Sequence, residues 1–390
     1  MGIQSASAAF VRFLVPEVAT ADFWGFIDEK LRAGSFKELD EGQEQAMGFV
    51  SWDDLFDPAF DSGSYHRGEY LAFQFRCDQR SVPAIIRKQY LRRRVEEYRA
   101  SNNGKWPSRQ ERLEIQENVQ DWLMNRMMAK PAGCEVVWNP AARWLLLGAT
   151  GTKMIDAFLS HFEQYFRVYP LPLYHVHWAL NLVPLEARQK DVLSSMVSVG
   201  SAQAMYEGRP LGYEFLTWLW FLIEDGGGVI RLADDRSAEV GLGERMVLVL
   251  PADGKERVIC TTQANELHEA RTALRQGKLV DELQLFLRVQ DNEYFLTLDS
   301  FLWAIRGLRT PKQLRDFEED DPEGKFLEKM YFIEEVASVL NACYGQFLTK
   351  RLSSAWESET LPRLRKWAEQ ARPETQDPHH EQPPRMAERH

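Results

Sequence analysis

Residues 69–76, EYLAFQFR, and residues 134–138, CEVVW, are two apolar stretches on either side of a long, basic segment. The first stretch alternates in the manner of a β-strand with at least one buried face: Leu71, Phe73 and Phe75 fall on one side, and Tyr70, Ala72 and Gln74 on the other. The second stretch predicts another strand, which forms a β-hairpin with residues 143–147. Whatever lies between these strands is therefore an insertion.

Two helices are predicted within this insertion. Pro83 suits the first position of a helix that ends near Arg99, ahead of Asn102-Asn103-Gly104, where Asn and Gly tolerate a left-handed backbone. Ser108 and Glu111 have the spacing of a capping box at the start of a second helix. The sequence therefore predicts a helical hairpin over residues 81–130.

Strands and helices alternate on both sides of this hairpin, which favours an α+β fold. At 390 residues the chain exceeds the size of one growing core, so more than one lobe is expected. An apolar stripe predicts one long helix near the C-terminus, formed by Phe326, Met330, Ile333, Val336 and Leu340. The predicted parts are a first α+β lobe (1–80 and 131–175), the basic hairpin (81–130), a second α+β lobe (176–315), a helical segment (316–371) and a polar, disordered tail (372–390).

The composition favours a cytoplasmic protein. Four cysteines lie far apart without a C-x-x-C pair, which is typical of reduced thiols. The N-terminus resembles a first strand more than a signal peptide. The longest largely apolar stretch, residues 215–223, is too short to cross a membrane. The net charge of −11 would repel a phosphate backbone, so any contact with DNA must use locally concentrated positive charge.

Sequence features that could carry catalysis are weak. Gly148-Ala149-Thr150-Gly151-Thr152-Lys153 lacks the spacing of a phosphate-binding loop and favours a strand-to-helix turn. His175 and His177 could share one face of a strand and bind zinc, but no third ligand follows nearby. We therefore predict no catalytic residues, no metal site and no cofactor.

Clustered carboxylates leave one enzymatic alternative open. Four aspartates lie in the loop of residues 53–61, and Glu224-Asp225 precede three glycines. Paired carboxylates can hold metal ions for phosphodiester cleavage, as in a metal-dependent nuclease. Loops also favour Asp because its side chain forms turns.

The strongest charge asymmetry lies in residues 76–112, where eleven basic and four acidic side chains give +7 and leave −18 for the remaining residues. Exposed cations beside Trp106 would suit non-specific contact with phosphates. The predicted DNA-binding residues are Arg87, Lys88, Arg92, Arg93, Arg94, Arg99, Lys105, Arg109 and Arg112.

Two other interpretations of this asymmetry remain. The arginines could lie on a solvated helix face, or they could pair with the acidic run that includes Asp316, Glu318 and Glu319. The chain could also be a protein-interaction module that uses the aromatic segment Phe215 to Phe221 and does not bind DNA.

Several stretches, in order over residues 8–352, resemble the RdgC family of recombination-associated proteins. The most specific is Glu224-Asp225-Gly226-Gly227-Gly228-Val229-Ile230-Arg231, which is similar to the family's E-D-G-G-V-I-R motif. Others are Met47-Gly48-Phe49-Val50, Val82-Pro83 before the basic helix, and Gly277-Lys278-Leu279. Where the family carries lysines after V-I-R, this chain has Leu232-Ala233-Asp234-Asp235.

The resemblance implies an α+β protein that forms a ring-shaped homodimer around double-stranded DNA without sequence preference. It also implies a nucleoid-associated role in which the protein restrains the RecA recombinase by occupying DNA, with no catalytic activity. Because the lysines after Arg231 are missing, the basic hairpin would take a larger share of DNA contact in this chain.

Overall fold

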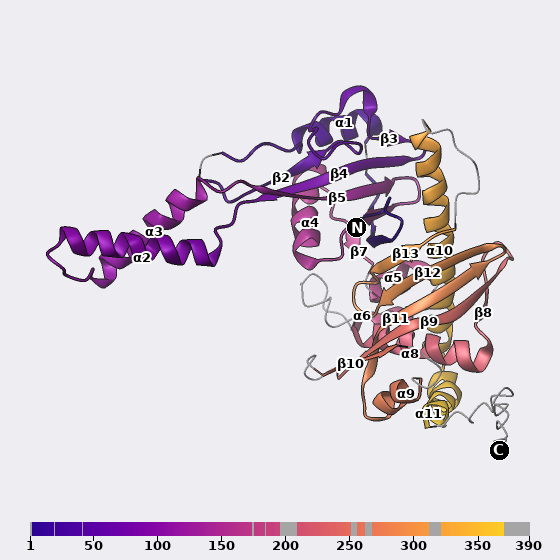
Figure 1. Cartoon of the computed structure of the whole chain (residues 1–390). Coiled ribbons are helices and arrows are strands. Elements are labelled where there is room, and N and C mark those ends of the chain that lie inside the picture. The colour runs from indigo at the N-terminus through magenta and orange to yellow at the C-terminus, as the bar shows by residue number, and fades with distance from the viewer. Residues whose placement is uncertain are drawn as a thin grey trace, which may run out of the picture.

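The computed structural model describes residues 2–369 except 19, 41, 174, 184, 196–208, 251–255, 262–266 and 312–320. Its strands form one continuous sheet in the order β10-β9-β11-β12-β13-β1-β6-β5-β4-β2, with β3, β7 and β8 paired to its members. Helices cover both halves of this sheet (Figure 1). The fold is α+β, as the alternation of strands and helices predicts.

The first half of the sheet is built by chain segments on both sides of the insertion. Two helices, α1 (Phe23–Ala33) and α4 (Thr152–Phe166), cover one face. That face buries Leu71, Phe73 and Phe75, while Tyr70 and Ala72 are buried in the core on the other side. The strands are β1 (Ala8–Leu14), β2 (Gln45–Val50), β3 (His66–Arg67), β4 (Tyr70–Gln79), β5 (Lys130–Asn139), β6 (Trp144–Leu147) and β7 (Leu171–Pro172), with a short 3-10 helix at Asp61–Gly63.

The second half of the sheet is an antiparallel array with helices from the C-terminal part of the chain. Its strands are β8 (Val229–Arg231), β9 (Ser237–Val249), β10 (Arg257–Thr261), β11 (Leu279–Val289), β12 (Asn292–Asp299) and β13 (Ile305–Arg309). Its helices are α5 (His175–Leu182), α6 (Ala187–Ser195), α8 (Arg209–Gly226), α9 (Leu267–Arg275), α10 (Pro322–Arg351), a π-helix (Trp356–Thr360) and α11 (Leu361–Glu369).

Strand β1 joins the two halves. Its residues Val11 to Leu14 pair with β6, whereas Ala8 and Phe10 pair with β13, and the register shifts between those two. Helix α10 also bridges the halves: Phe326 packs on Tyr70 of the first half, and Tyr344 packs on Phe215 of α8. The two halves therefore share one large hydrophobic core.

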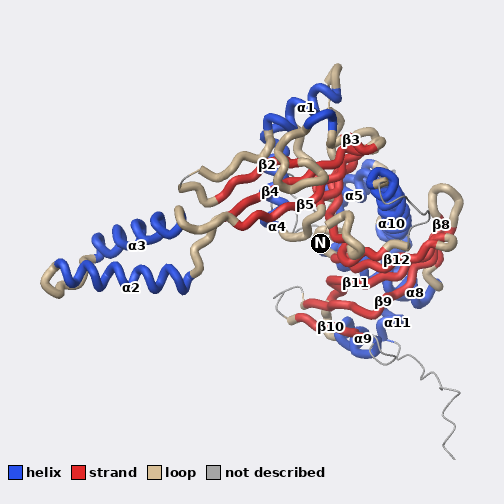
Figure 2. The backbone as a smooth tube through the Cα atoms, turned by 45° about the horizontal axis from the view of Figure 1, so that its top comes forward, coloured by secondary structure: helices blue, strands red, loops and turns tan. Residues whose placement is uncertain are grey.

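The inserted segment forms the predicted helical hairpin, α2 (Ala84–Ser101) and α3 (Arg109–Met124). The capping box of Ser108 and Glu111 is present, but Pro83 lies at the N-cap of α2 and not at its first helical position. We call α2, α3 and their connection the arm. It projects from the ends of β4 and β5, away from both halves of the sheet (Figures 1 and 2).

Two sequence-based interpretations are wrong. His175 and His177 lie in helix α5 and not on a strand, and residues two apart in a helix do not share a face. The aromatic segment from Phe215 to Phe221 is buried in the protein's own core, where it packs against α10 and Trp303, so it offers no docking surface.

The predicted acidic run and polar tail fall largely outside the described residues. The acidic residues Asp316, Glu318 and Glu319 and the tail from residue 372 onward belong to the part that the structure does not describe. Within the described ranges, none of the helices combines the length and apolar character that a membrane span requires.

Candidate nucleic-acid interface

The arm exposes most of its surface because its two helices pack mainly on each other. Helix α2 has no buried residue, and Leu91, Val95 and Tyr98 on its apolar stripe are only half-buried. In α3, Val119 and Leu123 are buried, and the rings of Tyr90 and Trp122 lie 5.1 Å apart between the helices. The faces of α2 that turn away from α3 are therefore available to a partner.

The tip of the arm is held by a hydrogen-bond network around Glu111. The backbone N–H of Ser108 donates to Glu111 Oε2 over 2.8 Å, and Tyr98 Oη donates to Glu111 Oε1 over 2.6 Å. These hydrogen bonds, first from Ser108 and then from Tyr98, lower the pKa of Glu111 to about 2. The network ties the end of α2 to the start of α3 across the turn.

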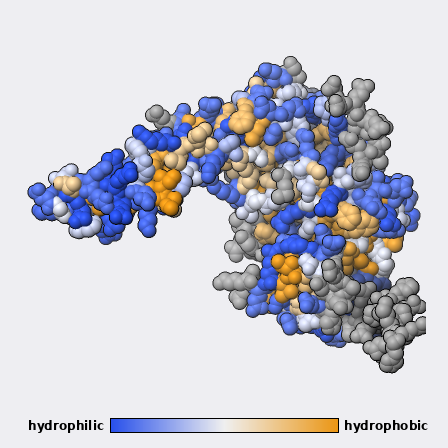
Figure 3. Space-filling model, viewed as in Figure 1, coloured by the Kyte–Doolittle hydropathy of each residue, from blue (hydrophilic) through white to orange (hydrophobic). Residues whose placement is uncertain are grey.

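Positive charge is concentrated on one of the two helices. Helix α2 carries six basic and two acidic residues, a net +4, whereas α3 carries two basic and four acidic residues, a net −2. The space-filling view shows the arm as largely hydrophilic (Figure 3). The arm is therefore polarised, with α2 as its basic side.

The cations of the arm differ in whether a carboxylate already neutralises them. Arg92 pairs with Glu96 over 3.0 Å and Arg94 pairs with Glu97 over 2.8 Å, all on the exposed surface of α2. In the described part of the chain, the predicted DNA-binding residues without an ion pair are Arg87, Lys88, Arg93, Arg99, Lys105, Arg109 and Arg112. Neighbouring carboxylates therefore neutralise two of the nine predicted DNA-binding residues, Arg92 and Arg94.

Aromatic rings accompany two of these arginines. The guanidinium carbon of Arg99 lies 4.0 Å from the centre of the Trp106 ring, and that of Arg93 lies 5.7 Å from the centre of the Tyr90 ring. Trp106 is itself exposed at the tip. Stacked aromatic and cationic groups of this kind are typical of surfaces that contact nucleic acids.

A groove of about 700 Å³ lies between the two helices. Arg87, Lys88 and Leu91 line it from α2, and Glu117 and Asp121 line it from α3. Opposite charges therefore face each other across the groove without forming ion pairs within 4 Å.

Two further arginines of the basic segment have structural roles. Arg76 is paired with Asp78 over 2.7 Å and stacks on Phe36 and Phe56. Arg80 donates to the backbone carbonyls of Asp40 and Gln43. The charge of +7 over residues 76–112 includes both arginines. It therefore overstates the positive charge that a partner could contact.

The comparisons with known proteins point in one direction. Residues 22–182, which include the whole arm, match a family model described as "Putative exonuclease, RdgC". The chain is also 24% identical over 276 residues to the "Recombination-associated protein RdgC" of Dechloromonas aromatica (strain RCB), covering 65% of this chain and 86% of that protein.

The chain is similar to proteins of the RdgC family. Ordered short motifs in the sequence predict this similarity, and the glycine-rich motif is the most specific of them. Residues 224–231, which carry that motif, lie outside the segment that the family model matches. The structure shows what this RdgC-like motif does in the fold.

Both carboxylates of the RdgC-like motif hold the C-terminal helix in place. Trp220 Nε1 and Trp367 Nε1 each donate to Glu224 over 2.9 Å, and Arg271 forms an ion pair with the same carboxylate. Asp225 pairs with Arg363 over 2.7 Å. These contacts join α8 to α9 and α11. Glu224 and Asp225 therefore bind side chains of the protein itself, whereas paired carboxylates in a metal-dependent nuclease would bind metal ions.

The glycines of the motif are required by the backbone. Gly227 and Gly228 adopt φ values of +70° and +67°, and a Cβ atom on Gly228 would lie 2.0 Å from the carbonyl oxygen of Val240. The chain then enters β8 and turns at Leu232 to Arg236, where Asp235 pairs with Arg231 over 2.8 Å. Of the two acidic residues in this turn, Asp235 thus pairs with Arg231, whereas Asp234 pairs with Arg236 over 2.7 Å.

The other chemical candidates also have local structural roles. Asp54 and Asp57 accept hydrogen bonds from backbone N–H groups two residues on, and Asp53 pairs with Arg67. Gly151 is the N-cap of α4, and Lys153 Nζ donates to Gln79. Over the described residues, no group of three or more His, Cys, Asp or Glu side chains is arranged to hold a metal ion.

Proposed function

We propose that this chain binds double-stranded DNA without sequence preference and that helix α2 of the arm contacts the phosphates. The observation that carries the proposal is the separation of charge. A chain of net charge −11 places a helix of net charge +4 on an arm that projects from the body (Figure 1).

Contact with the phosphates of DNA requires exposed, positively charged side chains. Arg87, Lys88 and Arg93 are exposed on α2 and have no ion pair among the described residues. Each phosphate that such a cation neutralises releases condensed counterions, which makes binding favourable and sensitive to salt. The flexible, unpaired side chains supply charge without a fixed arrangement of donors for base edges, so we expect no sequence preference.

We further propose that the protein acts as a homodimer that encloses DNA and restrains RecA by occupying it, in association with the nucleoid. A relative is named a recombination-associated protein, which supports a role in recombination. In a ring, only the inner wall needs positive charge, and the acidic remainder would keep the outside from binding polyanions.

The test is a salt titration of DNA affinity with the full chain. Fluorescence anisotropy with two duplexes of unrelated sequence should give equal affinities, and log K should fall linearly with log salt. The triple variant Arg87→Ala/Lys88→Ala/Arg93→Ala should weaken binding to both duplexes and flatten the slope by about 0.9 for each lost phosphate contact.

The matched control removes exposed cations from the body. Arg188 and Lys190 lie on α6, and the variant Arg188→Ala/Lys190→Ala should bind DNA as the wild type does. Equal losses in the two variants would place DNA contact outside the arm. Degradation of linear duplex on addition of Mg²⁺ or Mn²⁺ would favour the metal-dependent nuclease instead of a passive binder.

A further inference from the structure

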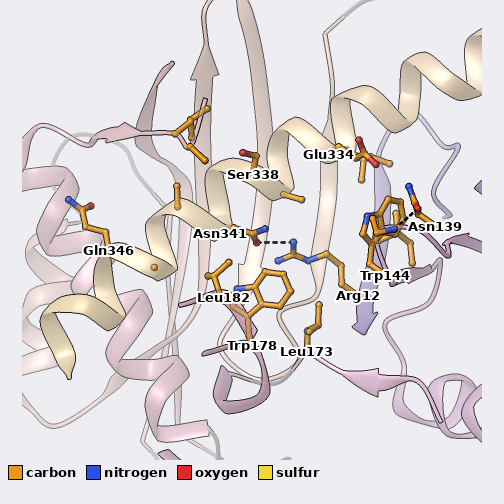
Figure 4. Close-up of a pocket in the computed structure, with 18 of the residues that line it drawn as sticks. Arg12, Asn139, Trp144, Leu173, Trp178, Leu182, Glu334, Ser338, Asn341 and Gln346 are labelled. Atoms are coloured by element: carbon orange, nitrogen blue, oxygen red, sulfur yellow. Dashed lines mark hydrogen bonds between the residues drawn. The ribbon is translucent and has the colours of Figure 1, made fainter. Parts of the chain in front are cut away.

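A pocket of about 890 Å³ lies where the two halves of the sheet meet α10. Its walls include Trp144 and Leu146 of β6, Trp178 and Leu182 of α5, and one face of α10 (Figure 4). Four of the eight α10 residues that line the pocket are small, namely Ala337, Ser338, Ala342 and Gly345. The small side chains leave room that a larger residue would fill.

Arg12 of β1 extends into this pocket and is only 5% exposed. Its neighbours on the same side of the strand, Phe10 and Ala8, are core residues. In β-strand alternation, an apolar side chain at position 12 would complete the packing. The guanidinium group lies near the rings of Trp178 and Trp303, but packing on rings leaves its charge without an anionic partner.

Arg12 lacks an anionic partner among the described residues. Its Nη1 donates to Asn341 Oδ1 over 3.2 Å, and the guanidinium carbon lies 4.6 Å from the ring centre of Trp178. Its Nε and Nη2 have no hydrogen-bond partner. Burial lowers the pKa of Arg12 to about 10, which still leaves it charged at neutral pH.

A second unsatisfied donor lies in the same wall. The indole N–H of Trp178 is also buried without a hydrogen-bond partner. Buried donors are costly unless an acceptor satisfies them, and a buried charge is costly unless it is paired. Arg12 and Trp178 thus present unsatisfied donors beside one cavity, and the neutral amide of Asn341 occupies a position where a charged oxygen would bind Arg12 more strongly.

An acidic residue of the lining, Glu334, is about two helical turns away from the Asn341 that Arg12 contacts. Glu334 accepts a hydrogen bond from Tyr70 over 3.0 Å, and it precedes Asn341 by seven residues, which is about 10 Å along a helix. Glu69 also lines the pocket, as does Arg231, which is paired with Asp235. The part of the pocket beside Arg12 is therefore the part that attracts an anion.

We propose that this pocket binds a small organic anion whose carboxylate or phosphate pairs with Arg12 and whose flat, apolar body lies against Trp178 and the small-residue face of α10. The pocket volume is within the range of small-molecule sites, which combine apolar walls with a few placed polar groups. The site is independent of DNA binding by the arm.

The experiment measures binding to the full chain by calorimetry. The probes are phenylacetate, phenyl phosphate and inorganic phosphate, with phenylacetamide as the uncharged control. We expect at least one anion to bind ten-fold or more tightly than phenylacetamide. A preference for phenylacetate identifies a carboxylate ligand, and a preference for either phosphate identifies a phosphate ligand. If no anion binds better than the amide, the proposal is overturned.

Two variants test the role of Arg12. Arg12→Met removes the charge and should abolish the preference for anions. Asn341→Asp keeps the shape but places a carboxylate beside Arg12; it should also abolish the preference and should raise the melting temperature of the free protein. This second variant keeps the test valid if Arg12→Met does not fold.

The matched control is Arg231→Met, which changes an exposed, ion-paired arginine that lines the same pocket. It should keep the preference for anions. Retention of the preference in Asn341→Asp, or its loss only in Arg231→Met, would also overturn the proposal. DNA affinity should be unaltered in Asn341→Asp, which separates this site from the arm.

Discussion

Tyr98 Oη donates a hydrogen bond to Glu111 Oε1 over 2.6 Å, and this contact joins the two helices of the arm across the turn. Tyr98 is in the last turns of α2, and Glu111 is in the first turn of α3. The same carboxylate completes the capping box with Ser108. One side chain thus fixes both the start of α3 and its position against α2.

The pH dependence of the arm follows from the lowered pKa of Glu111. The folded value of about 2 lies below the ordinary 4.5, so the ionised carboxylate stabilises the tip above pH 4.5, and this contribution is lost as the pH falls toward 2. We expect Glu111→Ala to reduce hydrogen-exchange protection of residues 98–112 at pH 6. The difference from wild type, corrected for intrinsic rates, should shrink toward pH 2. A difference that is the same at both pH values would contradict the role of the charge.

Release of the paired arginines should strengthen DNA binding. Glu96→Gln/Glu97→Gln frees Arg92 and Arg94 and raises the net charge of α2 from +4 to +6. We expect a higher affinity at low salt and a steeper salt dependence in anisotropy titrations. The control is Glu114→Gln/Glu117→Gln, which makes the same change of charge on α3. Equal effects of the two variants would mean that the field of the whole arm, and not contact with α2, determines affinity.

Adjacent glycines of the RdgC-like motif should differ in their tolerance of alanine. A Cβ atom on Gly227 meets nothing within 4 Å, so Gly227→Ala should cost only the left-handed backbone, about 1 kcal/mol. Gly228→Ala adds a clash with the Val240 carbonyl oxygen and should cost on the order of 3 kcal/mol or more. Urea unfolding measures the free energy of unfolding of both variants. Similar losses in the two would argue against a close approach of Gly228 to Val240 of β9.

The two carboxylates of the motif should also differ in their contribution to stability. Glu224→Gln removes a partly buried ion pair with Arg271 and weakens the hydrogen bonds from two tryptophans, so the free energy of unfolding should fall by about 2–4 kcal/mol. Asp225→Asn breaks a more exposed pair with Arg363 and should cost less than about 1 kcal/mol. A stable Glu224→Gln protein would show that these contacts do not anchor α11.

Local patterns were sufficient to predict many elements. The alternation of residues 69–76, the capping box at Ser108 and the stripe on α10 each depend on a few neighbouring residues, and each is present in the structure. Helix α5 was not predicted, because its short sequence has no strong periodicity and its packing against α10 and α8 is not local.

By itself, the sequence determined that the fold is α+β, that a basic helical hairpin interrupts it and that the motifs resemble the RdgC family. Tertiary structure decided which arginines are free, because Glu96 and Glu97 neutralise Arg92 and Arg94 only through the helical geometry of α2. It also decided that β1 belongs to both halves of the sheet and that Arg12 is buried beside a pocket. The physical reason is that strand register and burial depend on residues more than a hundred positions apart, such as Arg12 and Asn341, whose proximity leaves no trace in local sequence.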